Sequence, residues 1–276
     1  MGLAFDTGSP SSQIDEGPSS VYREYPPPAE LAPYLVCAWT LDIASGGRAH
    51  RQRVLPDACS DIVWIGDRPP IVVGAMTQAS LSTTTGATSL VGLRFRPESG
   101  ARVFGIRADE LTDRQVGLDQ VWRRQASSDL SERVLERREA KDRAAAAYSF
   151  LMSRRDRVAA IDRVVQRAVT LLGASRGDRI GEVAREVGIS ERQLRRRFLH
   201  SVGYTPKLFQ RVLRFQRLLA ITQARPSIGL ADAALLAGYA DQPHMTREVA
   251  ELSGVPPSAL LGHAVGALAL SELIRG

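Results

Sequence analysis

The order of apolar and polar positions divides the chain into a β-rich part and a helical part. Between residues 21 and 125, short β-branched or aromatic runs such as DIVWIGDRPPIVVGAM (61–76) are separated by Gly and Pro, the pattern of strands joined by turns. Within this part, residues 110–122 favour a turn and a short helix. From residue 126 onward the apolar positions recur at helical spacing. The pattern predicts an α+β protein with a barrel- or sandwich-like N-terminal domain and an all-α C-terminal domain.

Changes in composition along the chain predict where the domains begin and end. The first residues are polar and lack both a basic start and a long apolar run, which is typical of a disordered tail and not of a signal peptide. We expect a tail at 1–20, a β-rich sensor domain at 21–125, a helical linker at 126–173, a helical domain with two helix-turn-helix units at 174–262 and a helical extension at 263–276.

The predicted linker reads as two helices, and the second carries an apolar stripe. Its members recur at helical spacing: Val158, Ile161, Val165, Ala168 and Leu172. The stripe either packs on the neighbouring domains or forms the seam of a homodimer. It is too short for a convincing coiled coil.

Residues 179–203 have the pattern of a helix-turn-helix. Apolar residues at positions i, i+3, i+4 and i+7 form one face of the first helix, and Gly188 can take the left-handed conformation that ends it. Ser190 then opens a second helix, with Gln193 three residues later completing a capping box. Two short helices joined by a tight turn that contains glycine make a helix-turn-helix.

The second helix of this unit separates its apolar and basic residues. At about 100° per residue, Leu194 and Phe198 point to one side. From Arg192 to Arg225 there are nine basic residues and no acidic one, whereas a solvated helix normally mixes both signs. Arginine binds guanine or phosphate, so this surface predicts contact with nucleic acid. The arginines on the remaining surface of the helix are Arg192, Arg195, Arg196 and Arg197.

A second copy of the device follows at residues 230–254. An apolar face repeats the same spacing up to Gly238, and Asp241 can cap the next helix. Between the copies, residues 206–224 read as one helix with proline in its first turn. At about 1.5 Å per residue this helix spans roughly 28 Å. That length suits a spacer between two helices that enter successive major grooves, about 34 Å apart.

The charge of the chain agrees with an anionic partner, although it does not choose one. The formal net charge is +6, and almost all of the positive charge is arginine. Only two cysteines occur, Cys37 and Cys59, which are too few for a disulfide framework or a zinc site of four thiolates. We therefore expect no metal and no cofactor. Because no run of apolar residues is long enough to span a bilayer, we also expect a cytoplasmic protein without membrane contact.

The chain resembles the AraC/XylS family of bacterial transcriptional regulators. IGEVAREVGISERQLRRRF, GYTPKLFQRVLRFQR and AGYADQPHMTREVAELSGVPPSAL carry the resemblance, in the family's order and spacing over residues 178–262. VLPDACSDIVW, GLRFRPESG and ELTDRQVGL in addition resemble the β-rich N-terminal domain of one branch of these regulators. The resemblance implies a sequence-specific DNA-binding regulator or activator, two helix-turn-helix units in one protomer, and no enzymatic activity.

The resemblance also implies which residues contact DNA. In the first unit Arg192, Arg195 and Arg196 fall where bases are read, which leaves Arg197 for phosphate. Residues 226–276 hold five acidic residues against two basic ones, so we predict that the second unit binds DNA more weakly. The residues of the second unit that match the family's contact positions are Gln242, Pro243, Thr246 and Arg247.

For the N-terminal domain the resemblance implies an effector-sensing or dimer-forming role. Trp39, Trp64 and Phe95 could line a ligand pocket, or they could belong to the core. The partners implied are double-stranded DNA, RNA polymerase, an unknown small-molecule effector and a second copy of the chain. The alternative is a regulatory protein-interaction module with weak DNA affinity. An accessory alkyl-transfer enzyme would need a zinc-held cysteine, which two cysteines do not supply.

Overall fold

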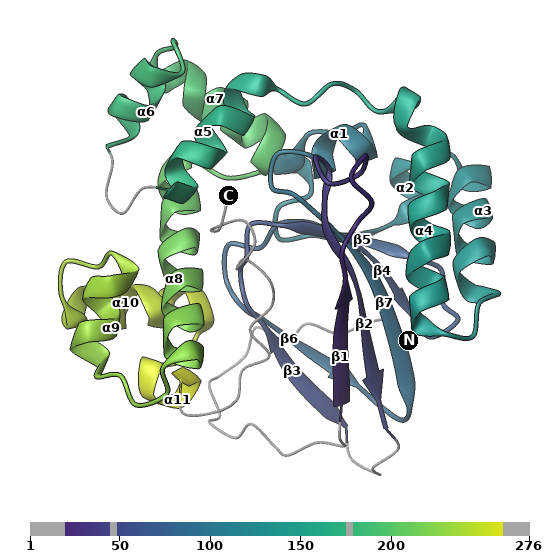
Figure 1. Cartoon of the computed structure of the whole chain (residues 1–276), viewed down its shortest axis with the longest axis horizontal. Coiled ribbons are helices and arrows are strands. Elements are labelled where there is room, and N and C mark those ends of the chain that lie inside the picture. The colour runs from purple at the N-terminus through teal and green to yellow at the C-terminus, as the bar shows by residue number, and fades with distance from the viewer. Residues whose placement is uncertain (1–19, 45–48, 175–178, 262–276) are drawn as a thin grey trace.

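A computed structural model describes residues 20–44, 49–174 and 179–261. The predicted extension at 263–276 lies outside the described residues, as does the predicted tail at 1–20 apart from Ser20, which begins the first strand. The predicted fold class is confirmed: a β-rich N-terminal region is followed by helices (Figure 1).

Within the described part of the N-terminal region, eight strands form two antiparallel sheets. The larger sheet has the order β1-β2-β7-β4-β5-β8, and β3 pairs with β6 in the smaller one. The register is continuous except for a bulge between Leu35 and Cys37, where β2 pairs with β7. The strands are β1 (Ser20–Tyr25), β2 (Leu35–Ile43), β3 (His50–Val54), β4 (Ser60–Ile65), β5 (Ile71–Val73), β6 (Ser80–Thr84), β7 (Thr88–Phe95) and β8 (Gln115–Gly117).

Short helices and two longer ones accompany these sheets. The two longer helices, at 124–135 and 140–154, pack on one face of the larger sheet, where Leu130 and Phe150 join Ile62 and Leu93 in one apolar cluster. Tyr148 fixes this packing, since its hydroxyl donates to the carbonyl of Tyr25 at 2.6 Å and accepts from the backbone N–H of Ala38. The elements are α1 (Gly100–Phe104), η1 (Ala108–Glu110), α2 (Leu118–Val121), α3 (Arg124–Leu135), α4 (Ala140–Arg154) and η2 (Arg155–Arg157).

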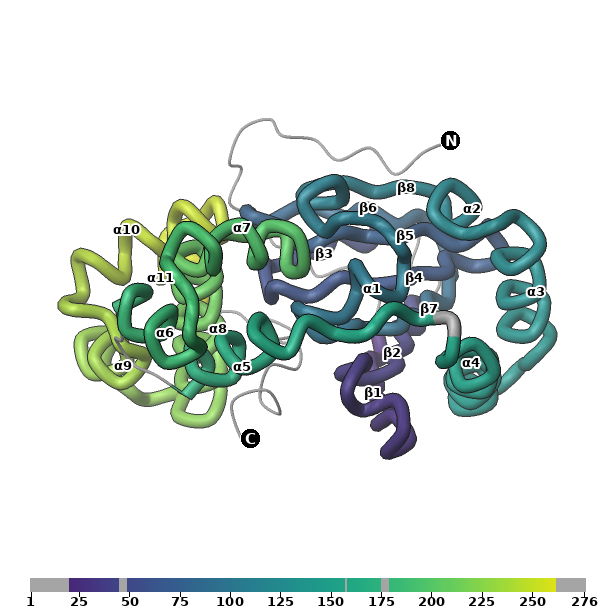
Figure 2. Tube along the Cα trace, turned by 90° about the horizontal axis from the view of Figure 1, so that it is seen from above, coloured from purple at the N-terminus to yellow at the C-terminus, as the bar shows by residue number. Residues whose placement is uncertain are grey.

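The C-terminal part of the described chain is helical. It comprises α5 (Arg163–Ala174), α6 (Ile180–Glu186), α7 (Glu191–Val202), α8 (Pro206–Ala224), α9 (Leu230–Ala237), α10 (Gln242–Ser253) and α11 (Pro257–Leu261). In Figure 1, α8 stands beside the sheets, with α5–α7 at one end and α9–α11 at the other. Figure 2 shows the β region between this helical lobe and helices α3 and α4.

The structure corrects two predictions about the middle of the chain. The predicted linker contains three helices rather than two, and Val158 and Ile161 lie outside them in an extended segment. The three remaining members of the stripe, Val165, Ala168 and Leu172, are buried in the core of the helical lobe. The stripe therefore packs on a neighbouring domain. The second correction is β8, a short strand at 115–117 within the segment expected to be only turn and helix.

The two lobes share apolar packing and are not connected by the chain alone. Ala58 and Ala75 of the β region belong to the same apolar cluster as Phe215 and Leu252 of the helical lobe. The segment 158–162 crosses from α4 to α5 over the end of the β region that carries α1 (Figures 1 and 2). The position of the helical lobe is therefore set by direct contact with the β region.

Candidate nucleic-acid interface

The first helix-turn-helix consists of α6, a tight turn and α7. Gly188 has a φ of 75°, the left-handed conformation that allows the chain to turn after α6. The Ser190 backbone N–H donates to Oε1 of Gln193 at 2.9 Å, and the Ser190 Oγ accepts from the Gln193 backbone N–H at 3.3 Å. This capping box fixes the residue at which α7 begins, as the sequence predicts.

Helix α7 buries its apolar side and exposes its arginines. Leu194 and Phe198 are fully buried, and the Phe198 ring meets Phe209 of α8 edge-on at 5.6 Å between centroids. Because the apolar side is anchored, the opposite side must face solvent. Three of the four predicted contact residues are exposed: Arg192, Arg195 and Arg196. None of these three forms an ion pair or hydrogen bond within the described part of the chain.

Arg197, the predicted phosphate contact, is paired with an acidic side chain of the segment before α5. Its Nη1 lies 3.0 and 3.1 Å from the two carboxylate oxygens of Asp162. Asp162 also accepts the backbone N–H of Val164 at 3.0 Å, so it opens α5 and holds α7 at the same time. The Arg197 side chain remains 42% exposed, and a phosphate would compete with Asp162 for it. The assignment of Arg197 to phosphate stays a prediction.

The second helix-turn-helix repeats the backbone of the first. Gly238 has a φ of 96°, and the Asp241 carboxylate accepts the backbone N–H of His244 at 2.7 Å, which begins α10. Met245 and Val249 are fully buried and anchor α10 as Leu194 and Phe198 anchor α7. All four predicted contact residues of this helix are exposed: Gln242, Pro243, Thr246 and Arg247.

A buried carboxylate fastens α10 to the spacer helix α8. Glu248 is 5% exposed, and its Oε2 lies 3.0 Å from Nε of Arg211 and 2.9 Å from Nη2 of Arg214. Arg211 also pairs with Glu251, and the guanidinium of Arg214 lies 5.5 Å from the centre of the Tyr239 ring. Burial raises the pKa of the Tyr239 phenol. Arg211 and Arg214 belong to the nine basic residues between Arg192 and Arg225 from which DNA contact is predicted, and here both are paired within the protein.

The order of residues alone did not indicate this role of Glu248. Glu248 is one of the five acidic residues of 226–276 on which the prediction of weaker DNA binding rests, whereas its side chain points away from the exposed face of α10 and towards α8. A signal was present, because Glu248 follows the core residue Met245 by three positions. Its two partners, Arg211 and Arg214, are likewise three residues apart and share one face of α8.

The β region contacts both helix-turn-helix units by hydrogen bonds to their backbones. At the end of α7, Thr112 Oγ1 donates to the carbonyl of Gly203 at 3.1 Å. At the end of α10, Arg53 donates to the carbonyl of Ser253 at 2.8 Å, and the Ala79 backbone N–H donates to the carbonyl of Leu252 at 2.7 Å.

Two further hydrogen bonds hold the spacer helix and its N-terminal approach. Gln216 Nε2, buried on α8, donates to the carbonyl of Pro56 at 2.6 Å, and the Tyr204 hydroxyl donates to the carbonyl of Met76. Gly203 permits a close approach here, since a Cβ at this position would lie 2.4 Å from Thr112 Oγ1. The β region is thus hydrogen-bonded to both helix-turn-helix units and to the spacer helix α8 with the turn before it.

The structure does not gather the three residues predicted for a ligand pocket. Trp64 and Phe95 are fully buried in the core shared with α3 and α4. Trp39 lies on the other face of the sheet, where its ring packs against Gly92 and its Nε1 donates to Asp61 at 2.7 Å. Phe95 lines a cavity whose described lining includes neither Trp39 nor Trp64. Their role in ligand binding stays a prediction.

Beside Trp39 lies a buried cluster of charged groups. The Arg94 guanidinium is 3.4 Å from both Asp57 and Asp61, and its Nη1 has no hydrogen-bond partner among the described residues. Burial raises the pKa of Asp61 to about 6, although Arg94 acts in the opposite direction. Burial also raises the pKa of the nearby Cys37 thiol. Among the described residues, no group of three or more His, Cys, Asp or Glu side chains could hold a metal ion.

Comparison with known proteins agrees with the geometry of the helical lobe. Residues 183–263 match a family described as a helix-turn-helix domain, and residues 23–117 match a domain of unknown function, DUF6597. The class of protein is therefore that of helix-turn-helix DNA-binding proteins. More specifically, its C-terminal domain is an AraC-type helix-turn-helix domain, and the chain is a DNA-binding transcriptional regulator of that type. No curated protein matches the sequence significantly.

Among solved structures, the chain is similar to ToxT from Vibrio cholerae. An apo ToxT variant has 13% identity and a TM-score of 0.44, with 82% of this chain and 96% of that one covered. ToxT bound to an unsaturated fatty acid has 11% identity and a TM-score of 0.45, with 93% and 99% covered.

No helix among the described residues is both long and apolar enough to cross a membrane.

Proposed function

We propose that α7 and α10 of one protomer enter two successive major grooves of operator DNA, and that an effector bound by the N-terminal region controls this binding. The observation that carries the proposal is the exposed side of α7. Its three guanidiniums have no intramolecular partner within the described residues, although acidic side chains pair elsewhere with Arg197, Arg211 and Arg214. Free guanidiniums on an anchored, capped helix suit guanine edges and phosphates.

Direct readout is assigned unequally to the two units. Arg192, Arg195 and Arg196 would supply base contacts from α7, whereas α10 offers one exposed cation, Arg247, beside Gln242, Pro243 and Thr246. Pro243 has neither a side-chain nor a backbone donor, so its contact with DNA would be apolar. The first unit would therefore supply most of the affinity.

Control by the N-terminal region is supported by the hydrogen bonds that join it to both units. Arg53 and Ala79 bond the end of α10, and Thr112 bonds the end of α7. A conformational change in the β region would alter the angle between α7 and α10, and the β region would not need to contact DNA to do so. We further propose that the protein acts in the cytoplasm, where the DNA lies, and contacts RNA polymerase there. A homodimer would need a surface other than the stripe that includes Val165 and Leu172, because that stripe is buried.

Genome-wide mapping of the bound DNA tests this function. The expected result is a recurrent motif with two elements about one helical turn apart, 10–10.5 base pairs from centre to centre. Purified protein should shift fragments carrying the motif in competition with unrelated DNA, and the affinity should fall steeply as salt is raised. Bound regions without a shared motif would contradict sequence-specific binding.

A protein-interaction role is the second candidate, and one observation favours it. Leu235 of α9 is 60% exposed and is followed by Leu236, which is also exposed, so the second unit presents apolar side chains to solvent. Exposed apolar surface is typical of contacts between proteins. If the gel shift finds only weak binding that does not depend on sequence, this candidate replaces the first one.

A further inference from the structure

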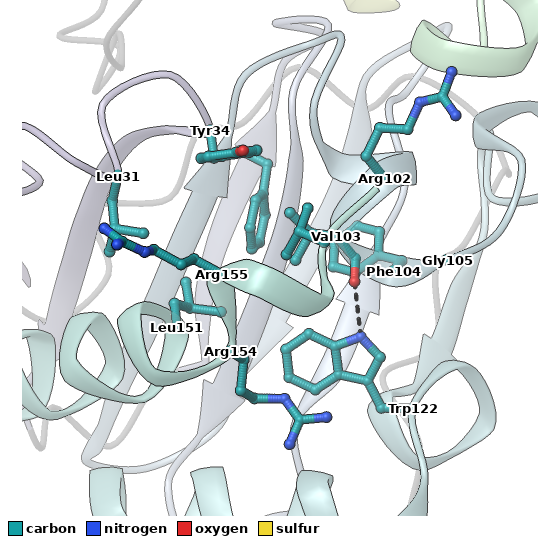
Figure 3. Close-up of a pocket in the computed structure, with 12 residues that line it drawn as sticks. Leu31, Tyr34, Arg102, Val103, Phe104, Gly105, Trp122, Leu151, Arg154 and Arg155 are labelled. Carbon is teal, nitrogen blue, oxygen red and sulfur yellow. Dashed lines mark hydrogen bonds between the residues drawn. The ribbon is translucent and has the colours of Figure 1, made fainter. Parts of the chain in front are cut away.

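A cavity of about 220 Å³ lies in the N-terminal region, and Phe95 is the one residue of the sequence-predicted ligand pocket that lines it. Its lining comes from the loop before β2, the end of β7 with the nearby helix α1, Trp122, and the segment from the end of α4 to Val158. Figure 3 shows Tyr34, Val103, Leu151 and Trp122 around it. The Trp122 Nε1 donates to the carbonyl of Val103 at 3.0 Å, which holds the indole in the wall.

The cavity combines apolar walls with cations and has no carboxylate. Aromatic and aliphatic side chains form most of its lining, and none of the twelve lining residues is acidic. Three arginines belong to the lining: Arg102, Arg154 and Arg155. In Figure 3 the Arg155 guanidinium lies beside Leu31, whereas the Arg102 side chain extends away from the apolar side chains. A molecule in this cavity would meet apolar groups first and positive charge at its edge.

The three arginines differ in how far they are already engaged. Arg154 lies over the rings of Trp122 and Phe150, with its Cζ 5.7 and 5.3 Å from their centres. Among the described residues, the one ion-pair partner of Arg155 is the exposed Asp156, at 3.6 Å. Arg102 forms no hydrogen bond or ion pair with any residue that the structure describes. Arg102 and Arg155 can therefore donate to a ligand without losing a strong partner.

We propose that this cavity binds a small apolar molecule that carries one carboxylate, and that this molecule is the effector. The apolar part lies between Tyr34, Phe104 and Trp122, and the carboxylate accepts hydrogen bonds from Arg102 or Arg155. Charge-assisted hydrogen bonds from arginine to carboxylate are among the strong ones in proteins. A neutral ligand would leave the cations without an anion, and a second charge placed among the apolar side chains would be buried without a partner.

The position of the cavity connects it to the first recognition helix. Val158 lines the cavity and begins the extended segment that ends at Asp162, the residue that holds Arg197 of α7. Helix α1, which carries Arg102, also packs beside α7. A ligand that draws Arg155 or Arg102 inwards would thus act on two elements that contact α7. The assignment as effector site rests on the proposed function, whereas the binding of a carboxylate does not.

Titration calorimetry of the full-length protein with 3-phenylpropionate tests the binding. Its neutral counterpart, 3-phenyl-1-propanol, keeps the ring and the chain and lacks the carboxylate. The acid should bind about ten-fold more tightly than the alcohol, because only the acid can form charge-assisted hydrogen bonds. Arg102→Gln and Arg155→Gln together should abolish this preference. Arg68→Gln, in the exposed turn between β4 and β5, is the matched control and should leave it unchanged.

A second variant tests the place of binding. Val103→Phe adds a ring where the Val103 side chain lines the cavity, and it should abolish binding of both probes while thermal melting shows that the protein is folded. No binding of the acid to the wild-type protein at millimolar concentration would overturn the proposal. Equal binding of acid and alcohol, or unchanged binding by Val103→Phe, would overturn it as well.

The effector role is tested separately on an operator fragment. Bound 3-phenylpropionate should change the affinity of the wild-type protein for this DNA several-fold, and it should have no such effect on Val103→Phe. Binding of the acid without any change in DNA affinity would overturn the effector role. If the ligand-free protein fails to bind DNA specifically, the proposed function falls, and the calorimetric result on the cavity still stands.

Discussion

The two helix-turn-helix units have the same backbone and different surfaces. Each has a left-handed glycine at the turn, a capping side chain, Ser190 or Asp241, and two buried anchors on the second helix. On α7 three arginines are free within the described residues, whereas α10 has one exposed cation and turns its buried carboxylate, Glu248, onto the spacer helix. The exposed arginines of the first unit have no partner among the described residues, whereas the buried carboxylate of the second unit attaches that unit to α8.

This comparison shows that net charge is a poor guide to what a unit presents to DNA. The acidic composition of residues 226–276 suggests repulsion from phosphate. Yet Glu248 is buried against Arg211 and Arg214, and Asp241 accepts a backbone N–H at the start of α10. What separates the two units is the supply of free donors on the exposed side of each helix.

The largest expected effect comes from removing the carboxylate that fastens the second unit. Glu248→Ala leaves the largely buried Arg214 without its anion and leaves Arg211 paired with the exposed Glu251, and we expect the unfolding free energy to fall by about 3 kcal/mol. Urea unfolding followed by circular dichroism measures this loss. Glu251→Ala is the control, because its side chain is 63% exposed and should matter by less than about 1 kcal/mol. Equal losses in the two variants would contradict a special role for Glu248.

The next effect concerns DNA recognition itself. Arg196→Ala should weaken specific binding by about 1–3 kcal/mol, and Arg247→Ala should weaken it less. The reason is that Arg196 belongs to a group of three free arginines on α7, whereas Arg247 is the exposed cation of α10. Fluorescence anisotropy at fixed salt, against both operator and unrelated DNA, measures the difference. Losses of the same size would remove the predicted asymmetry between the units.

A smaller effect is expected where the linker holds a recognition residue. Asp162→Asn keeps an oxygen that can cap α5 but removes the charge that binds Arg197. Arg197 is then free for phosphate, so the slope of log affinity against log salt should steepen by about 0.9. A salt series measures this slope. Arg197→Gln in the same background should return the slope to its original value; if it does not, another group is responsible.

The smallest expected effect separates the contacts that the β region makes with each unit. Arg53→Gln weakens the hydrogen bond to the carbonyl of Ser253 at the end of α10, at a cost of about 0.5–1 kcal/mol. Hydrogen exchange should become faster in the last turn of α10 and stay unchanged in α7. Faster exchange in both helices would indicate that the units are coupled through the β region rather than held separately.

Much of the helical lobe is predictable because its signals are local. The capping box of Ser190 and Gln193, the glycine turns at Gly188 and Gly238, and the bounds of α8 at 206–224 depend on residues a few positions apart. The apolar spacing likewise identified Leu194 and Phe198, the anchors of α7. Such interactions form within one or two turns of helix, so the order of residues is enough to indicate them.

The middle of the chain was harder to predict, because its apolar spacing continues past the end of a helix. Val158 and Ile161 fit the helical period of Val165 and Leu172 but lie in the extended crossing between α4 and α5. Of the residues that line the cavity, the sequence indicated Phe95 alone. The other walls of the cavity come from α1, Trp122 and the end of α4, and the aromatic residues proposed from sequence lie mainly in the core or on the other face of the sheet.

The sequence by itself determined two capped helix-turn-helix units, a 19-residue spacer helix and a basic surface on the first unit. Only the tertiary structure decided which arginines stay free. Asp162 and Arg197 are 35 residues apart, and Glu248 and Arg214 are 34 apart, so neither pair follows from any local pattern. Charges at such separations meet only after the lobes have packed. Each pairing gives an arginine a carboxylate partner, in a buried setting for Glu248 and Arg214 and a half-exposed one for Arg197, while exposed arginines without a carboxylate in reach remain available.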